Sequence, residues 1–159
     1  MKILVTGANG YLGQGIVKAI LDSGHEVIAA DFKVDHVDDR ARKKACNLFD
    51  VESPYTFFGR PDVLLHLAWR DGFVHYSDAH IEDLPKHYAF IKAFAEAGCK
   101  RIAVMGSMHE IGFFEGSIDE HTPCNPTTPY GIGKNAFREL TDMLCKKNGC
   151  VFQLSLIHI

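Results

Sequence analysis

The 159-residue sequence predicts a single α/β domain, built as a doubly wound parallel sheet in three αβα layers. Strand-like and helix-like segments alternate along the whole chain, without repeats or a low-complexity linker. A glycine-rich turn joins the first strand to the first helix. The apolar run Val63–Leu65 is typical of a strand that is covered on both faces.

The first half of the chain is expected to hold two strands, one long helix and several short elements. In order, these are a strand at 2–6, a helix at 11–23 ended by Gly24, a strand at 26–30, a short helix at 38–44, a brief strand at 45–48 and a helical turn at 53–58.

The second half is expected to repeat the alternation with longer elements. In order, these are a strand at 62–67, a helix at 81–97, a strand at 101–105, a Gly- and Pro-rich loop at 106–129, a helix at 130–148 and a strand at 151–156. Gly98 and Gly149 end the two helices.

Composition argues against several classes of function. The net charge of −3 gives no reason to expect nucleic acid or an anionic membrane as partner, and no apolar stretch approaches a membrane span. The basic run Arg40–Lys44 follows two aspartates and is expected to be a solvated helix face. The first strand leaves no room for a signal peptide, and five scattered cysteines indicate reduced thiols, so we expect a cytoplasmic protein. The scattered histidines predict no metal site.

The turn after the first strand carries Gly7, Gly10 and Gly13 in a Gly-x-x-Gly-x-x-Gly spacing. Gly7 suits the tight turn, Gly10 lets the backbone approach a phosphate, and Gly13 lets the helix pack close to the sheet. Asn9 can brace the loop through backbone hydrogen bonds. The turn therefore predicts a dinucleotide site at the positive end of a helix, although a glycine turn that binds nothing is the alternative.

Asp31 ends the second strand, 18 residues after Gly13. A carboxylate there accepts hydrogen bonds from ribose hydroxyls and repels a 2′-phosphate, which favours NAD over NADP. Lys33 and Arg40 weaken this preference, because a nearby cation accommodates a phosphate.

Tyr130 and Lys134 are four residues apart and share one face of the last helix. A lysine ammonium near a tyrosine stabilises its phenolate, so the pair can move a proton to or from an alcohol oxygen. Ser107 follows the fifth strand, at the edge where open αβ sheets bind ligands, and can hydrogen-bond the same oxygen. A surface helix and a turn-capping serine are the alternatives.

Together with His66-Leu67-Ala68, these motifs resemble the extended short-chain dehydrogenase/reductases, the NAD-dependent epimerase/dehydratase family, over residues 2–154. The resemblance implies a Rossmann-type domain with Ser107, Tyr130 and Lys134 as catalytic residues. It implies that cofactor contacts come from Gly7, Asn9, Gly10, Tyr11, Leu12, Gly13, Asp31, Asn47, Leu48, Leu67, Ala68, Tyr130 and Lys134. His109 and Glu110 either contact substrate or order the loop after Ser107.

The resemblance also implies hydride transfer between NAD and a nucleotide-activated sugar, and a homodimer formed through the helices at 81–97 and 130–148. Glu82 and Asp83 stand where the family usually has an Asn. Residues 155–159 do not resemble the family, so we expect an incomplete domain (1–159) without the C-terminal substrate domain. The alternative function is an NAD-binding fragment or sensor without turnover.

Overall fold

The computed structural model describes residues 1–119 and 121–157, the last two by their backbone alone. Residues 158 and 159, part of the segment 155–159 that is expected to differ from the family, lie outside this description. The described residues form a six-stranded parallel sheet in the order β3-β2-β1-β4-β5-β6. The strands are β1 (Lys2–Thr6), β2 (Glu26–Asp31), β3 (Arg42–Ala45), β4 (Val63–His66), β5 (Arg101–Ser107) and β6 (Val151–Ile157).

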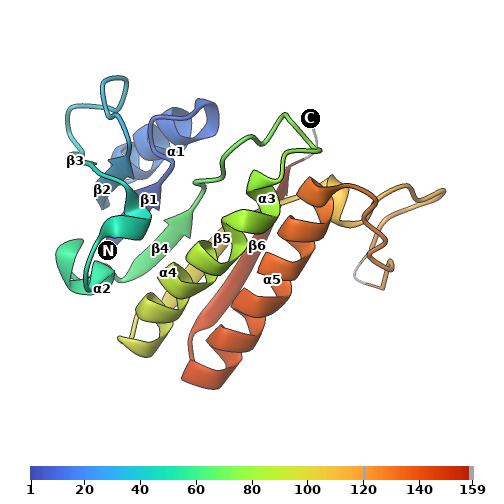
Figure 1. The fold of residues 1–159 in the computed structure, drawn as a ribbon. Coiled ribbons are helices and arrows are strands. Elements are labelled where there is room, and N and C mark those ends of the chain that lie inside the picture. Colours follow the sequence, from blue (N-terminus) through green and yellow to red (C-terminus); the bar gives the residue numbers. More distant parts are fainter. Residues whose placement is uncertain (120, 158–159) are drawn as a thin grey trace.

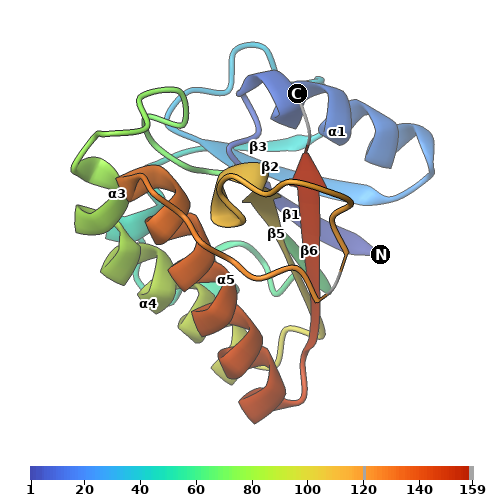
Figure 2. The ribbon, with the colours of Figure 1, turned by 90° about the vertical axis from the view of Figure 1, so that its right-hand side faces the viewer.

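Helices cover both faces of this sheet, which confirms the predicted three layers (Figures 1 and 2). The helical elements are α1 (Tyr11–Asp22), η1 (Leu48–Asp50), α2 (Pro54–Phe57), α3 (Ala79–Glu82), α4 (Leu84–Glu96), η2 (Met108–Glu110) and α5 (Pro129–Asn148). Helix α1 lies on one face, and α3, α4 and α5 lie on the other. The direction of winding changes between β1 and β4, so a crevice is expected beyond their carboxyl ends.

The core consists of two clusters, one on each face of the sheet. Because successive strand residues point to opposite faces, Leu4 packs in the cluster that includes Phe94 of α4, whereas Ile3 and Val5 pack in the cluster that includes Val17 of α1. Burying each such side chain stabilises the fold by about 1.5–3 kcal/mol. The sheet is therefore a rigid platform for the loops at its carboxyl edge.

The prediction of a short helix at 38–44 is wrong. Residues 42–45 instead form edge strand β3, in which Arg42 pairs with Ile28 of β2. The Asp38 carboxylate accepts hydrogen bonds from the backbone N–H and the guanidinium of Arg40, and this local bonding competes with a helix. The basic residues thus lie on a charged sheet edge, which discourages pairing with another chain.

The prediction of a single helix at 81–97 is also wrong, because this region forms two helices, α3 and α4, that meet at Asp83. Pro85 lies in the first turn of α4 and has no N–H to donate to the preceding turn. Asp83 therefore lies at the junction of two helices and not inside one.

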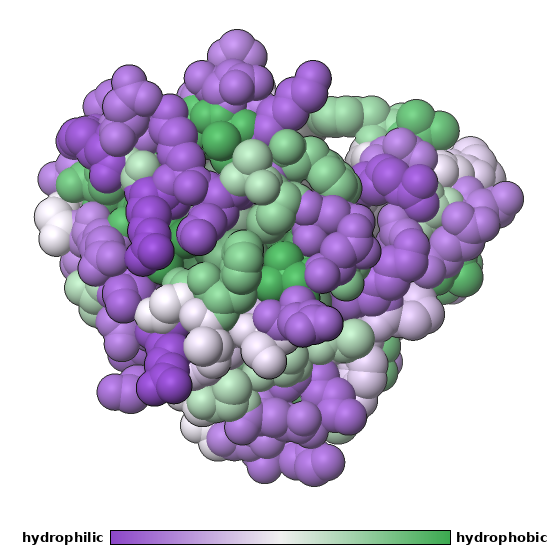
Figure 3. Space-filling model, turned by 60° about the vertical axis from the view of Figure 1, so that its left-hand side comes forward, coloured by the Kyte–Doolittle hydropathy of each residue, from purple (hydrophilic) through white to green (hydrophobic). Residues whose placement is uncertain are grey.

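The surface combines charged and apolar areas. On the face in Figure 3, apolar residues occupy the middle and hydrophilic residues border them. The exposed aromatic side chains include Tyr11, which begins α1 after β1, and Phe73 and Phe113, which lie in the segments after β4 and β5. No helix among residues 1–119 and 121–157 is long and apolar enough to cross a membrane.

Candidate active site

The glycine turn has the geometry that the sequence predicts. Gly7 has a φ of +67°, and a Cβ there would lie 2.7 Å from the backbone nitrogen of Ala68. A Cβ on Gly13 would lie 2.2 Å from the carbonyl oxygen of Gly7, so helix α1 can approach the turn only without a side chain. A Cβ on Gly10 would meet no atom closer than 3.3 Å, so the packing of the turn does not require a glycine here. The missing side chain instead leaves the space above the turn open.

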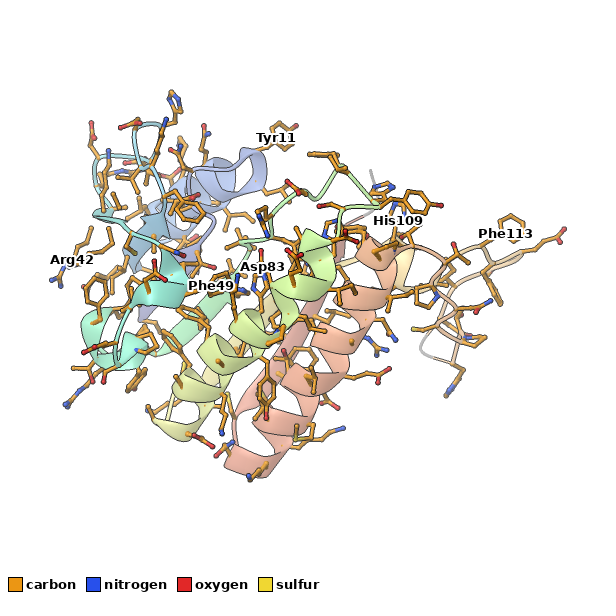
Figure 4. All side chains as sticks on the ribbon, viewed as in Figure 1. Tyr11, Arg42, Phe49, Asp83, His109 and Phe113 are labelled. Carbon is orange, nitrogen blue, oxygen red and sulfur yellow. The ribbon has the colours of Figure 1, made fainter. Side chains whose placement is uncertain are left out.

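A groove of about 520 Å³ lies above this turn, at the carboxyl ends of β1, β2 and β4. Its walls are formed by Gly7, Gly10, Asp31, Phe32, Cys46, Asn47, Leu48, Phe49, Leu67, Ala68, Trp69, Arg70, Asp83, Lys86 and His87. Figure 4 labels two of these wall residues, Phe49 from η1 and Asp83 from the junction of α3 and α4.

Seven of the thirteen predicted cofactor residues line the groove, whereas the other six do not: Asn9, Tyr11, Leu12, Gly13, Tyr130 and Lys134. The Tyr11 side chain is 91% exposed and projects from the start of α1 (Figure 4). Gly10 precedes the helix without a side-chain cap. The first N–H groups of α1, those of residues 11–13, have no hydrogen-bond partner in the described part of the chain and form a positive helix end beside the groove.

Asp31 is held in place at one end of the groove. Its Oδ2 accepts a hydrogen bond from the backbone nitrogen of Asn9 at 3.0 Å, and its Oδ1 accepts one from Phe32 at 2.7 Å. The Asn9 side chain accepts a hydrogen bond from the backbone of His36, so Asn9 braces the loop as expected. Arg40 is engaged elsewhere, with its guanidinium 2.8 Å from Asp22 and 2.7 Å from Asp38.

The opposite wall carries a compact charged group around Asp83. The Asp83 carboxylate pairs with Arg70 at 2.9 Å and with Lys86 at 2.7 Å. Burial opposes ionisation, but the hydrogen bonds from Lys86 and Arg70 hold the pKa of Asp83 below its usual value. The ion pairs keep two cations at the edge of the groove.

Lys134 is buried near the far end of the groove. Its Nζ donates a hydrogen bond to the carbonyl oxygen of Met105 and lies 4.4 Å from the ring centre of Trp69, which lines the groove. Burial lowers the pKa of Lys134 to about 8, although the nearby Glu110 carboxylate opposes this shift. An amine with a pKa close to neutrality can release and take up a proton under physiological conditions.

Ser107 ends β5 and caps the short turn η2. Its Oγ accepts a hydrogen bond from the backbone of His109 at 3.2 Å, and its own backbone nitrogen donates to Oε1 of Glu110 at 2.7 Å. The buried Glu110 also lies 3.3 Å from Nε of Arg138, and burial raises the pKa of its carboxyl group. Glu110 therefore orders the loop, which is one of the two roles that the sequence left open.

Tyr130 begins α5 beside this turn. Its backbone nitrogen donates to the carbonyl of His75 at 3.0 Å, and its ring lies against the rings of His75 and His109, with ring centres 5.3 and 5.4 Å away. A Cβ on Gly131 would lie 2.3 Å from the carbonyl oxygen of His109, so η2 is pressed against the first turn of α5. Figure 4 shows His109 near this end of α5.

Ser107, Tyr130 and Lys134 thus share the carboxyl edge of the sheet, but none of them lines the groove itself. Trp69 connects the two parts, because it forms groove wall and packs against Lys134. No group of three or more His, Cys, Asp or Glu side chains in the described residues could hold a metal ion.

Sequence reasoning missed much of the wall opposite the glycine turn, including Trp69, Arg70, Lys86 and His87. Trp69 and Arg70 directly follow the predicted strand at 62–67, and that position alone could have placed them at the ligand-binding edge. Lys86 and His87 follow Asp83 by three and four residues, so a helix face shared with Asp83 was the signal for this second pair.

The sequence profile of the family described as "NAD dependent epimerase/dehydratase family" matches residues 3–157. The chain belongs to this family. An epimerase/dehydratase relative, dTDP-6-deoxy-L-talose 4-dehydrogenase (NAD(+)) of Aggregatibacter actinomycetemcomitans, is 40% identical over 161 residues, which cover 87% of this chain and 53% of the relative. UDP-glucose 4-epimerase of Mycolicibacterium smegmatis is 26% identical, with 91% and 54% covered. The chain spans about half the length of these relatives.

Solved structures of similar proteins have the same fold as this member of the epimerase/dehydratase family. The UDP-Glc/GlcNAc 4-epimerase of Campylobacter jejuni superposes with a TM-score of 0.86 at 19% identity, over 98% of this chain and 52% of that one. The UDP-glucose 4-epimerase of Thermus thermophilus in complex with NAD superposes with a TM-score of 0.82 at 24% identity, over 97% and 54%.

Proposed function

We propose that this chain binds NAD in the groove above the glycine turn and forms the cofactor part of a sugar-nucleotide epimerase or dehydrogenase. The observation that carries the proposal is the combination of unpartnered N–H groups at the start of α1 with a braced carboxylate, Asp31, at one end of the same groove. A diphosphate suits the helix end, and ribose hydroxyls suit the carboxylate.

The groove residues suit the parts of a dinucleotide in order. Asp31 would hold the adenosine ribose, and Asn47, Leu48 and Phe49 would form the adenine side. Gly10, which leaves the groove open, would face the diphosphate. Leu67, Ala68 and Trp69 would form the nicotinamide side, which leads toward Lys134.

The chemistry we propose uses the residues at this last end of the groove. Bound NAD would supply the hydride acceptor for a sugar carbon. Tyr130 would exchange a proton with the sugar oxygen, and the positive charge of Lys134 would make the phenolate less costly to form. Ser107 has a hydroxyl hydrogen available to hold the same oxygen, because its Oγ accepts the bond from His109. The names of the relatives support a nucleotide-activated sugar as substrate.

NAD is favoured over NADP by the charges around Asp31. The carboxylate would repel a 2′-phosphate, and the guanidinium of Arg40 is engaged by Asp22 and Asp38. The experiment is calorimetric titration of NAD and NADP into the wild-type chain and Asp31→Ala. We expect the wild type to prefer NAD, and Asp31→Ala to reduce that preference by at least tenfold.

The matched control is Asp35→Ala, which removes the same charge from the exposed loop that follows. It should leave the preference within about twofold, since exposed charges are well screened. Absence of NAD binding to the wild type would contradict the proposed function. An unchanged preference in Asp31→Ala would contradict only the role of Asp31.

A further inference from the structure

Three buried side chains form a hydrogen-bonded line that runs from the end of β1 to the groove. The Thr6 hydroxyl lies 2.8 Å from Nδ1 of His66, and Nε2 of His66 lies 2.8 Å from Nδ1 of His87. Thr6, His66 and His87 are 0%, 2% and 3% exposed, and His87 lines the groove. The catalytic proposal above makes no use of this line.

Both rings are neutral at physiological pH. Burial lowers the pKa of His87 to about 3 and moves the pKa of His66 well below its usual value, and the charge of Lys134 acts in the same direction. A neutral imidazole carries one N–H, so one nitrogen of each ring donates and the other accepts. Two arrangements of the line, opposite in direction, are then conceivable.

The Thr6 hydroxyl selects between them. Its oxygen is also approached by the backbone N–H of Ala68, at 3.5 Å, which is a donor. The only acceptor within reach of the hydroxyl hydrogen in the described part of the chain is Nδ1 of His66. Since a buried hydroxyl hydrogen is costly to leave unpaired, Thr6 donates to His66. His66 must then carry its hydrogen on Nε2 and donate to Nδ1 of His87, which leaves the hydrogen of His87 on Nε2.

Nε2 of His87 is the free end of the line. This nitrogen has no hydrogen-bond partner in the described part of the chain. It is also not one of the fully buried polar atoms, so it is accessible and opens onto the groove. The Trp69 ring stacks on the imidazole at 4.5 Å and 15°, and Phe49 contacts it edge-on at 4.9 Å. These rings fix the plane of His87, so the N–H is oriented before any ligand arrives.

The neighbours of His87 indicate which part of a ligand it meets. Phe49 belongs to the proposed adenine side of the groove and Trp69 to the nicotinamide side, so His87 lies between them. The middle of a dinucleotide is its diphosphate with the adjoining ribose oxygens, all of which accept hydrogen bonds. Arg70 and Lys86, on the same wall, share the single carboxylate of Asp83, so the three groups together carry a net positive charge that suits this segment.

We propose that His87 is a further cofactor-binding residue, whose Nε2–H, oriented by Thr6 and His66, donates a hydrogen bond to an oxygen of the diphosphate–ribose segment of the bound dinucleotide. The inference rests on the proposed function, because it requires a dinucleotide in the groove. The direction of the line is a property of the chain alone and can be tested without any ligand.

The first experiment is nitrogen-15 NMR of the histidine rings in the ligand-free chain at pH 7. We expect both His66 and His87 to carry their hydrogen on Nε2, and Thr6→Ser, which keeps the hydroxyl, to preserve this state. Thr6→Val removes the donor and should change the shifts of both rings. A hydrogen on Nδ1 of His87 in the wild type, or a charged ring, would overturn the inference.

The second experiment is calorimetric titration with NAD. His87→Met removes the donor at similar volume and should weaken binding about tenfold, which corresponds to about 1.4 kcal/mol. His87→Gln keeps an N–H donor and an acceptor and should lose threefold or less. His80→Gln is the control, since His80 is equally buried and stacks on Trp69 but bonds Trp69 and Val74 internally and does not line the groove. It should leave affinity within about twofold.

The two titration outcomes separate this inference from the proposed function. Wild-type binding with equal affinity in His87→Met would overturn the role of His87 and leave the proposed function standing. A wild-type chain that binds no NAD would overturn the proposed function and the ligand assigned to His87. If His87→Met does not fold, an unchanged Nε2 resonance of wild-type His87 on saturation with NAD would overturn the role.

Discussion

At the scale of single residues, two glycines of α1 differ sharply in what surrounds them. A Cβ on Gly13 would lie 2.2 Å from the backbone oxygen of Gly7, whereas a Cβ on Gly15 would meet nothing within 4 Å. We expect Gly13→Ala to lower the free energy of unfolding by about 2 kcal/mol or more, because the contacted atoms are backbone and cannot rotate away. Gly15→Ala should raise it by about 0.5–1 kcal/mol, the usual gain in a helix. Urea unfolding of both variants measures the difference, and equal effects would contradict this account of the turn.

Lys134 predicts a pH dependence of stability. Its pKa is about 8 in the folded chain and 10.5 in the unfolded one, so the unfolded chain binds more protons between these values and stability rises with pH across that window. The Lys134→Met variant has no titrating amine at this position, so its free energy of unfolding should not show this increase with pH. We expect the free energy of unfolding of the wild type, relative to Lys134→Met, to increase by about 3 kcal/mol between pH 8 and pH 10.5.

Urea unfolding at a series of pH values provides the measurement. Lys147→Met is the control, because it removes an exposed lysine from the same helix and reports any general effect of losing a charge. If the difference in free energy of unfolding between the wild type and Lys134→Met stays constant from pH 8 to pH 10.5, Lys134 is well solvated and this account is contradicted.

At the scale of elements, the turn η2 depends on Glu110. Its carboxylate accepts the backbone hydrogen bond of Ser107 and lies beside Arg138 of α5, so it joins β5 to α5. We expect Glu110→Ala to lower the free energy of unfolding by about 2–3 kcal/mol, because it leaves the buried N–H of Ser107 unpaired and removes the buried carboxylate beside Arg138. Glu110→Gln keeps a hydrogen-bond acceptor and should lower the free energy of unfolding by about 1 kcal/mol.

The control for this turn is Glu115→Ala, which alters an exposed carboxylate on the loop that follows. Exposed substitutions usually change stability by less than about 0.5 kcal/mol. Thermal unfolding compares the three variants, and a loss in Glu110→Ala no greater than that in Glu115→Ala would show that Glu110 does not hold the turn.

Elements also show what the sequence could and could not predict. The buried strands and long helices follow from apolar periodicity, because burial imposes that pattern on the residues themselves. Strand β3 has no apolar run, since the edge strand Arg42–Ala45 is held by backbone pairing with β2, and periodicity could not reveal it. The division at Asp83 depends on how Pro85 is placed in the first turn of α4, which a pattern with helical spacing conceals.

The candidate site divides in the same way. The glycine turn and Asp31 are local features with fixed spacing, so the sequence could predict them. The opposite wall comes from Phe49, Trp69 and His87, which are far apart in the chain and meet only because β4 lies beside β1 and α4 packs on the sheet. The direction of hydrogen bonds in such a wall depends on three-dimensional neighbours and has no sequence signal.

At the scale of the whole molecule, the groove couples ligand binding to stability. Its walls come from segments after β1, β2, β3 and β4, and from the start of α4, so a dinucleotide would contact both sides of the switch between β1 and β4.

A ligand that binds only the folded chain stabilises it by mass action, by about 2.7 kcal/mol at a concentration of 100 Kd. For a chain of this length, each kcal/mol shifts Tm by about 2–4 °C. We therefore expect NAD at 100 times its Kd to raise Tm by about 5–10 °C, and NADP at the same concentration to raise it less. Differential scanning fluorimetry measures both shifts, and Asp31→Ala should bring the two closer together. A Tm that stays unchanged in saturating NAD would mean that NAD does not bind the folded chain in preference to the unfolded one, and this result would contradict a cofactor site that spans the sheet.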